Sequence, residues 1–263
     1  MTAPPATAIH LWGGVSLPIH TLFEMLAYAL GFRLFLMLRR RIGDPLETFD
    51  RVSVVAAAIA GAGIGSKLMV WLQHPDLLRS SGIGALLTGK SVLGALLGGL
   101  VLVEWVKRAM GIRRPTGDLY VLPLCLGIAL GRIGCFLNGL QDGTYGTASA
   151  LPWAVDFGDG IRRHPVQLYE IAFLTPVAVW AARRLRRGLS DGSVFRGFLI
   201  AYLSFRVALD FIKPEPRPYL GFTGTQIAGL AGLAYLASVA IRERALSGAP
   251  LSAPAAGEAP RGR

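Results

Sequence analysis

The chain has 263 residues, of which 52% are hydrophobic and only 16% are charged, and its formal net charge is +11. This composition excludes an ordinary soluble globular domain. It favours a polytopic membrane protein, because several windows reach the roughly 20 apolar residues that cross a bilayer as a helix.

Seven membrane-spanning helices are predicted, so the expected fold class is an all-α, polytopic membrane protein. The expected spans are, in chain order, 17–38, 52–72, 84–105, 119–139, 167–182, 196–212 and 221–241. No basic segment precedes the first span, so we expect no cleavable signal peptide. Residues 1–246 are expected to form a single transmembrane domain, and residues 247–263, rich in Ala, Pro and Gly, a disordered cytoplasmic tail.

Lys and Arg alternate between sparse and dense along the predicted connections. The dense connections hold Arg39, Arg40, Arg41 and Arg51, then Lys107, Arg108, Arg113 and Arg114, then Arg183, Arg184, Arg186, Arg187 and Arg196. By the positive-inside rule, this alternation predicts an N-terminus outside and a C-terminus in the cytoplasm. The positive charge therefore reflects topology, and nucleic acid is not an expected partner.

The fourth span contains Arg132, although a charged residue at the centre of a membrane helix costs about 2.5 to 3.5 kcal/mol. Cys135 and Asn138 follow at i+3 and i+6 on a gradually turning face of this predicted helix. Small residues make the same helix slim, so that a neighbouring helix or a lipid headgroup can approach it closely: Gly127, Gly131 and Gly134.

The sixth span, "FRVALDFIKPEP", places Arg206, Asp210 and Lys213 on one helical face. The third span begins with "TGKSVLG", which brings Lys90 to the same depth. With Arg132, four cations gather in the outer half of the membrane. A phosphodiester headgroup is the expected ligand, because guanidinium binds phosphate oxygens bidentately and stays charged. We expect Arg132, Arg206 and Lys213 to share one cavity with Asn138.

The longest predicted outer connection follows the fourth span and ends with "RRHPVQLYE". Ordered outer loops tend to carry function, and His164 is placed here. Histidine suits proton transfer because its unperturbed side chain titrates near pH 6.5. Cys125 and Cys135 fall on one helix roughly 15 Å apart, too far for a disulfide. No CxxC and no cluster of Cys and His along the chain indicates a metal, so no cofactor is expected.

Three of these segments, "GRIGCFLNG", "RRHPVQLYE" and "FRVALDFIKP", resemble in the same order the motifs of the bacterial prolipoprotein diacylglyceryl transferases. The resemblance extends over most of the chain. It implies that Arg132 and Arg206 are the two key arginines and that Asn138 is the signature asparagine. It also implies that Gly143 or Gly146 is the closing glycine, and that Asp210 and Lys213 replace a glutamate and an arginine.

The chain also departs from the family pattern and resembles a divergent branch. The family usually has asparagine where Cys135 stands, glutamate where Leu140 stands, and a catalytic histidine at or near Leu93. The tyrosine usually found beside the first "IH" is missing as well, with Leu22 after "IHT" and Glu24 close by.

The resemblance implies a multi-pass enzyme of the bacterial plasma membrane. It would transfer the diacylglyceryl group of phosphatidylglycerol to the lipobox cysteine thiol of prolipoproteins. Such chemistry needs a thiolate nucleophile and cations that stabilise the departing phosphate. Arg132 and Arg206 are the cations suited to stabilising the departing phosphate.

The candidates for accepting the proton of the acceptor thiol are Lys90, His164, Glu24 and Asp210. Lys90 is preferred, with a pKa expected to be lowered by the neighbouring arginines.

Several alternatives remain open at this point. The protein could be a relative that binds phospholipid or a lipoprotein precursor without turnover. Arg132 could pair with Asp210 or Glu24 only to fix helix packing, and Arg206 with Asp210 could form a self-contained pair. Cys135 is expected to be a small packing residue, and His164 could simply cap the fifth span.

Overall fold

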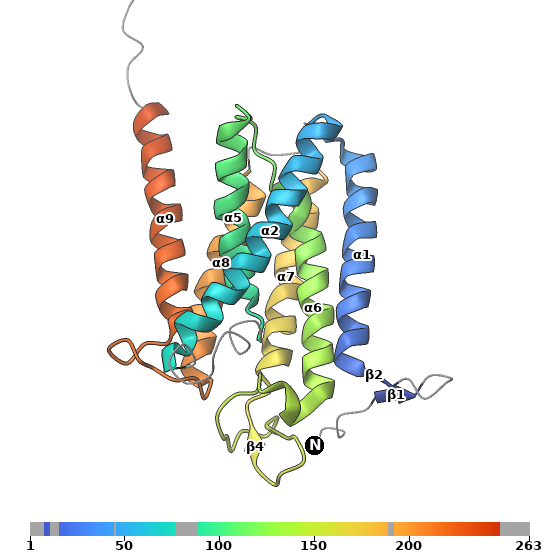
Figure 1. Ribbon diagram of the computed structural model, residues 1–263, viewed down its shortest axis with the longest axis vertical. Coiled ribbons are helices and arrows are strands. Elements are labelled where there is room, and N and C mark those ends of the chain that lie inside the picture. The colour runs from blue at the N-terminus through green and yellow to red at the C-terminus, as the bar shows by residue number, and fades with distance from the viewer. Residues whose placement is uncertain (1–7, 11–15, 45, 77–88, 189–191, 248–263) are drawn as a thin grey trace, which may run out of the picture.

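The protein is a bundle of long helices in the computed structural model, which describes residues 8–10, 16–44, 46–76, 89–188 and 192–247 (Figure 1). Seven helices of this described part correspond to the seven expected spans. They are α1 (Ile19–Ile42), α2 (Thr48–Gln73), α5 (Val92–Ala109), α6 (Val121–Asn138), α7 (Val166–Leu185), α8 (Ser193–Leu209) and α9 (Gly224–Ser247). The expected tail, from residue 248 onward, and residues 84–88 of the third span lie outside the described residues.

Within the described part of the chain, four segments are long and apolar enough to cross a membrane: Ile19–Ile42, Thr48–Gln73, Asp118–Asp142 and Gly224–Glu243. The helices α5, α7 and α8 are shorter or carry more charge. For example, α5 contains Glu104, Lys107 and Arg108 within 18 residues. The chain is therefore an all-helical protein with membrane-spanning helices.

Small elements gather at one end of the bundle, where the α6–α7 connection lies (Figure 1). Two antiparallel pairs form there, β1 (Ala8–His10) with β2 (Ser16–Pro18) and β3 (Val155–Asp156) with β4 (Arg162–Arg163). Two single turns of 3-10 helix, η2 (Gly139–Asp142) and η3 (Asp210–Ile212), continue α6 and α8 at this end. A third, η1 (Asp118–Tyr120), precedes α6 at the opposite end of that helix. The ends of α6 and α8, and the start of α7, thus meet beside the connection.

The helix α8 lies at the centre of the apolar core. Its residues Phe198, Leu199, Tyr202 and Leu203 are fully buried. Leu93 of α5 is fully buried in the same cluster. The position where the family resemblance expects a histidine is therefore part of the hydrophobic core.

Glycines set the closest helix contacts. A Cβ on Gly65 of α2 would lie 2.3 Å from the carbonyl oxygen of Gly94 in α5, and one on Gly98 would lie 2.3 Å from that of Gly61. Both helices therefore use a Gly-xxx-Gly face, which lets their backbones touch.

The slim face expected for α6 contacts α1 at Gly134. A Cβ there would lie 2.8 Å from that of Phe23. Gly131 has nothing within 4 Å of such a Cβ, so this glycine makes no close helix contact among the described residues.

Candidate active site

A buried carboxylate, Glu170, joins three helices. It lies at the end of "RRHPVQLYE" in the second turn of α7 and is only 1% exposed. Arg132 of α6 places Nε 2.8 Å from Glu170 Oε2, and Arg206 of α8 donates from Nη1 to the same oxygen at 3.0 Å. Tyr202, one turn before Arg206, donates its hydroxyl to Oε1 at 2.6 Å. One carboxylate thus holds the two arginines side by side.

Arg132 and Arg206 therefore meet at one carboxylate, whereas the packing partners considered for them are wrong. The carboxylate that pairs with both is Glu170, and Asp210 instead accepts a hydrogen bond from the hydroxyl of Thr223. Glu170 closes the motif "RRHPVQLYE" but is not among the site residues predicted from the sequence. The available signal was an acid inside a predicted span, which is as costly as an arginine there and needs a partner.

Asp210 and Lys213 support the turn from α8 to α9. Asp210 is fully buried, and its partner Thr223 also accepts a hydrogen bond from the backbone N–H of Gln226 at the start of α9. Lys213 donates to Glu215 at 2.8 Å. The expected joining of Lys213 to the arginines is not seen among the contacts of the described residues.

The α6–α7 connection positions the glycines and the histidine selected from the sequence. Gly143 has a φ of +63°, in the left-handed region that favours glycine. The N–H of Gly146 donates to the carbonyl of His164 at 2.9 Å, and a Cβ on Gly146 would lie 2.7 Å from that of His164. The imidazole Nδ1 of His164 lies 3.1 Å from the hydroxyl of Tyr169. Asn138 is the half-buried last residue of α6.

Lys90 does not have the environment expected from the sequence. Its Nζ donates to both carboxylate oxygens of Glu24, at 2.8 and 2.9 Å, and its side chain is 67% exposed. The hydrogen bonds to Glu24 raise the pKa of Lys90 above its usual value. The expected lowering of the Lys90 pKa is wrong, because the neighbour is a carboxylate and not a guanidinium.

A chain of polar contacts leads from Lys90 back to Arg132. Beyond Glu24 lies His20, whose Nε2 is 3.4 Å from Glu24 Oε1 and whose Nδ1 is 3.2 Å from Asp142 Oδ1. Arg132 in turn donates from Nη1 to the sulfur of Cys135 at 3.8 Å. The sulfur, the imidazole and the Asp142 carboxylate lie together at the ends of α6 and α1. Sequence reasoning missed His20 and Asp142, which lie far apart in the chain.

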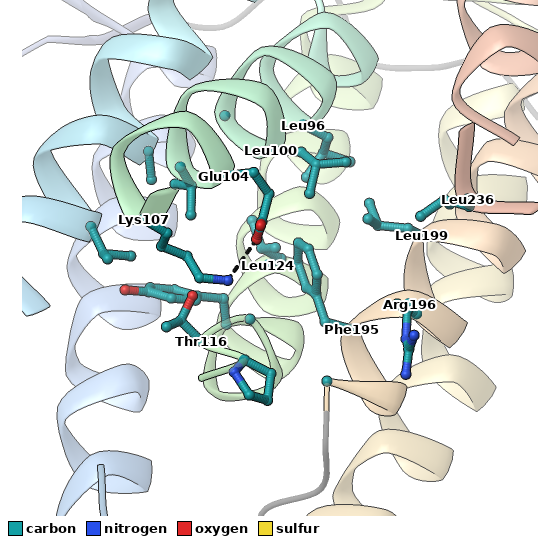
Figure 2. Close-up of a pocket in the computed structure, with 18 of the residues that line it drawn as sticks. Leu96, Leu100, Glu104, Lys107, Thr116, Leu124, Phe195, Arg196, Leu199 and Leu236 are labelled. Carbon is teal, nitrogen blue, oxygen red and sulfur yellow. Dashed lines mark hydrogen bonds and ion pairs between the residues drawn. The ribbon is translucent and has the colours of Figure 1, made fainter. Parts of the chain in front are cut away.

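A separate cavity of about 530 Å³ lies among α2, α5, α6, α8 and α9 (Figure 2). Its walls are mostly apolar, and Lys107 and Glu104 form an ion pair of 2.8 Å beside it. Its lining includes neither Arg132 nor Arg206. This cavity is therefore distinct from the shared headgroup cavity that the sequence predicts.

Comparison with known proteins bears on the family of the chain. The family model described as "prolipoprotein diacylglyceryl transferase" matches residues 6–242. The chain is 32% identical to the phosphatidylglycerol–prolipoprotein diacylglyceryl transferase of Geobacter sulfurreducens, covering 74% of this chain and 78% of the relative. It is 34% identical to the enzyme of that name from Methylobacillus flagellatus, covering 81% and 85%. The match therefore covers nearly all of the helical bundle, and the chain belongs to the prolipoprotein diacylglyceryl transferase family.

Proposed function

We propose that this protein transfers the diacylglyceryl group of phosphatidylglycerol to the lipobox cysteine thiol of prolipoproteins, the first step of bacterial lipoprotein maturation. The observation that best supports this function is the buried cluster of Arg132, Glu170 and Arg206. Two guanidinium charges and one carboxylate charge leave one net positive charge. A phosphodiester carries one negative charge and therefore complements the cluster.

The arginines also keep donors for such a headgroup. Each guanidinium has five N–H groups in a planar fork, and Glu170 occupies only some of them. The Nε of Arg206 is buried without a hydrogen-bond partner among the described residues. In this proposal, Arg132 and Arg206 bind the phosphate and stabilise the negative charge that grows on it as the bond to carbon breaks.

The reaction forms a thioether. A thiolate attacks the sn-3 carbon of the diacylglyceryl group, the C–O bond to the phosphate breaks, and its electron pair leaves with glycerol phosphate. The proton of the acceptor thiol is lost before the attack, because the thiolate is the reactive form. Lys90, with its raised pKa, keeps its own proton at neutral pH and is a poor base for this step.

The remaining residues selected from the sequence are assigned supporting roles. Asn138 and Gly143 flank the end of α6 beyond Arg132, where we place the rest of the headgroup. Gly146 and His164 hold the α6–α7 connection against α7, and His164 stays a candidate for proton transfer. Asp210 and Lys213 shape the turn after Arg206, and Glu24 positions Lys90 at the membrane surface.

We further infer a single domain over residues 1–246 with seven spans, an outside N-terminus and a cytoplasmic C-terminus, in the bacterial plasma membrane. Successive helices run up and down the bundle, so the ends of α1, α6 and α8 that carry the site face one side (Figure 1). The densest basic segments lie at the other ends of these helices, for example Arg39, Arg40 and Arg41 in the last turn of α1. The positive-inside rule then supports the site facing outward.

The test is transfer from labelled phosphatidylglycerol to a lipobox peptide by the purified protein. We expect Arg132→Lys and Arg206→Lys to lower transfer by about 10²-fold or more, because lysine cannot bind phosphate bidentately. The matched control is Arg196→Lys, since Arg196 pairs with Glu243 on α9, away from Glu170. Wild-type transfer rates in both site variants would contradict the assignment of the two arginines.

A second candidate function is binding of the lipid or precursor without turnover, favoured by the burial of Leu93 where the family resemblance expects a histidine. The same experiment separates the two functions. Binding of phosphatidylglycerol without any thioether product would select the second function and exclude the first.

A further inference from the structure

Three side chains of the types that bind zinc lie together beside Arg132. They are His20 in the first turn of α1, Cys135 in the last turn of α6 and Asp142 in η2. Their ligand atoms all lie within 4.8 Å of one another. Imidazole, thiolate and carboxylate are the donors that zinc takes, and catalytic zinc sites use three protein ligands and keep one position open.

The geometry of His20 and Asp142 suits ligands that share one ion. The Nδ1 of His20 lies 3.2 Å from Asp142 Oδ1, yet this buried nitrogen has no hydrogen-bond partner among the described residues. Two atoms that each lie about 2.0 to 2.1 Å from a tetrahedral zinc are roughly 3.3 Å apart. The two atoms therefore have the spacing of neighbouring ligands and lack the geometry of a hydrogen bond.

Outer contacts orient these ligands as they do in known metal sites. The other imidazole nitrogen of His20, Nε2, lies 3.4 Å from the carboxylate of Glu24. A carboxylate at this nitrogen keeps the proton there and leaves Nδ1 free to bind a metal. The second oxygen of Asp142, Oδ2, accepts a hydrogen bond from Thr144 at 2.7 Å, and Thr144 accepts one from Gln167 at 3.2 Å. Asp142 Oδ1 is thereby directed toward His20.

The surrounding charges are compatible with a divalent cation. A thiolate at Cys135 and the carboxylate at Asp142 would neutralise its two charges, with neutral His20 as the third ligand. Arg132 donates toward the sulfur at 3.8 Å and shares the Glu170 carboxylate with Arg206. Lys90 is likewise paired with Glu24. The side chain of His20 is 27% exposed, which gives the site an entry path.

We propose that His20, Cys135 and Asp142 form a zinc site whose open position binds the acceptor thiol of the prolipoprotein. A thiol bound to zinc loses its proton, here to water, so the acceptor sulfur would be held as a thiolate next to Arg132. That sulfur then forms the bond to the sn-3 carbon, and the electron pair of the broken C–O bond leaves with the phosphate held by the arginines. The role of the metal rests on the function proposed above, whereas the existence of the site does not.

The first experiment measures the metal alone. The full chain, purified in detergent and loaded with Co²⁺ in place of zinc, is expected to bind one Co²⁺ per chain and to show the ultraviolet thiolate-to-cobalt charge-transfer band. Cys135→Ala should abolish the band, and Asp142→Asn should weaken Co²⁺ binding. The matched control is Cys125→Ala, which removes the other buried cysteine of α6 and should keep the band. A band that persists in Cys135→Ala, or is missing from the wild type, overturns the site.

The variant Glu24→Gln distinguishes a partner of the metal ligand His20 from a purely structural contact. Glu24→Gln should weaken Co²⁺ binding by about 10- to 100-fold, the usual effect of losing an outer partner of a ligand, while the charge-transfer band at saturation stays. Unchanged affinity in Glu24→Gln would contradict its role beside His20.

The role of the site is tested by adding a lipobox peptide to the cobalt-loaded protein. We expect a stronger charge-transfer band with the peptide thiol and no change with the same peptide carrying serine. An unchanged spectrum with the thiol peptide overturns the role of the open position. Because metal binding is measured without phospholipid, a protein that binds Co²⁺ but transfers nothing would overturn only the proposed function. Full transfer by metal-free protein would overturn only the role of the metal.

Discussion

At the scale of single residues, Glu170 is the group on which the site depends. It is fully buried and compensates two guanidinium groups at once. Removing one partner of a buried ion pair is costly, because the charges that remain stay buried without compensation.

We therefore expect Glu170→Gln to lower the free energy of unfolding by about 3 to 5 kcal/mol, the usual cost of breaking a buried pair. Denaturant unfolding in detergent would measure it. The same substitution at Glu243, which is 56% exposed in its pair with Arg196, should cost only about 0 to 1 kcal/mol. Equal losses in the two variants would show that the Glu170 pair is no stronger than a surface pair.

The sequence predicted the arginines better than their partners. Arg132 and Arg206 stand out because an arginine in an apolar span needs a polar neighbour. Their shared neighbour, and the meeting of His20 with Cys135 and Asp142, depend on which faces of α1, α6, α7 and α8 meet. That information is set by packing between segments distant in the chain. The prediction for Lys90 was wrong for the same reason, since its pKa depends on Glu24 of α1, a segment distant in the chain.

At the scale of helices, the contact between α2 and α5 depends on glycine. Gly65→Ala should destabilise the protein by about 1 to 3 kcal/mol, because the added Cβ would lie 2.3 Å from a backbone oxygen that has no room to move. Gly63 lies two residues earlier on α2, is exposed and has nothing within 4 Å of an added Cβ. Gly63→Ala should be neutral or slightly stabilising, and a comparison of thermal unfolding midpoints would check both. Similar midpoints for the two variants would contradict the close contact.

The existence of the helices was predicted well, because long apolar runs identify them directly. Their ends were less accurate. The sixth span was expected to reach residue 212, but α8 ends at Leu209 and a turn of 3-10 helix follows. The second was expected to begin at residue 52, but α2 begins at Thr48 and includes the buried Arg51, which pairs with Asp44. Such ends depend on polar contacts that hydropathy does not register.

At the scale of the whole molecule, the proposed topology is tested by labelling cysteines in spheroplasts with a maleimide that does not cross membranes. Both native cysteines are buried, so the wild type is a suitable background. Ala150→Cys, in the exposed α6–α7 connection, should react in intact spheroplasts, whereas Arg187→Cys, after α7, should react only once the membrane is opened. Reaction of position 187 in intact spheroplasts would overturn the orientation.

The shared carboxylate also has a consequence for how the chain is made. Helices enter the membrane in the order of synthesis, so α6 brings Arg132 into the bilayer before its partner exists, and α7 then supplies Glu170. Arg206 arrives 36 residues later, at a carboxylate that Arg132 already holds in place. A nascent chain that stops before α7 therefore carries an arginine in the membrane without its carboxylate, at an insertion cost of about 2.5 to 3.5 kcal/mol.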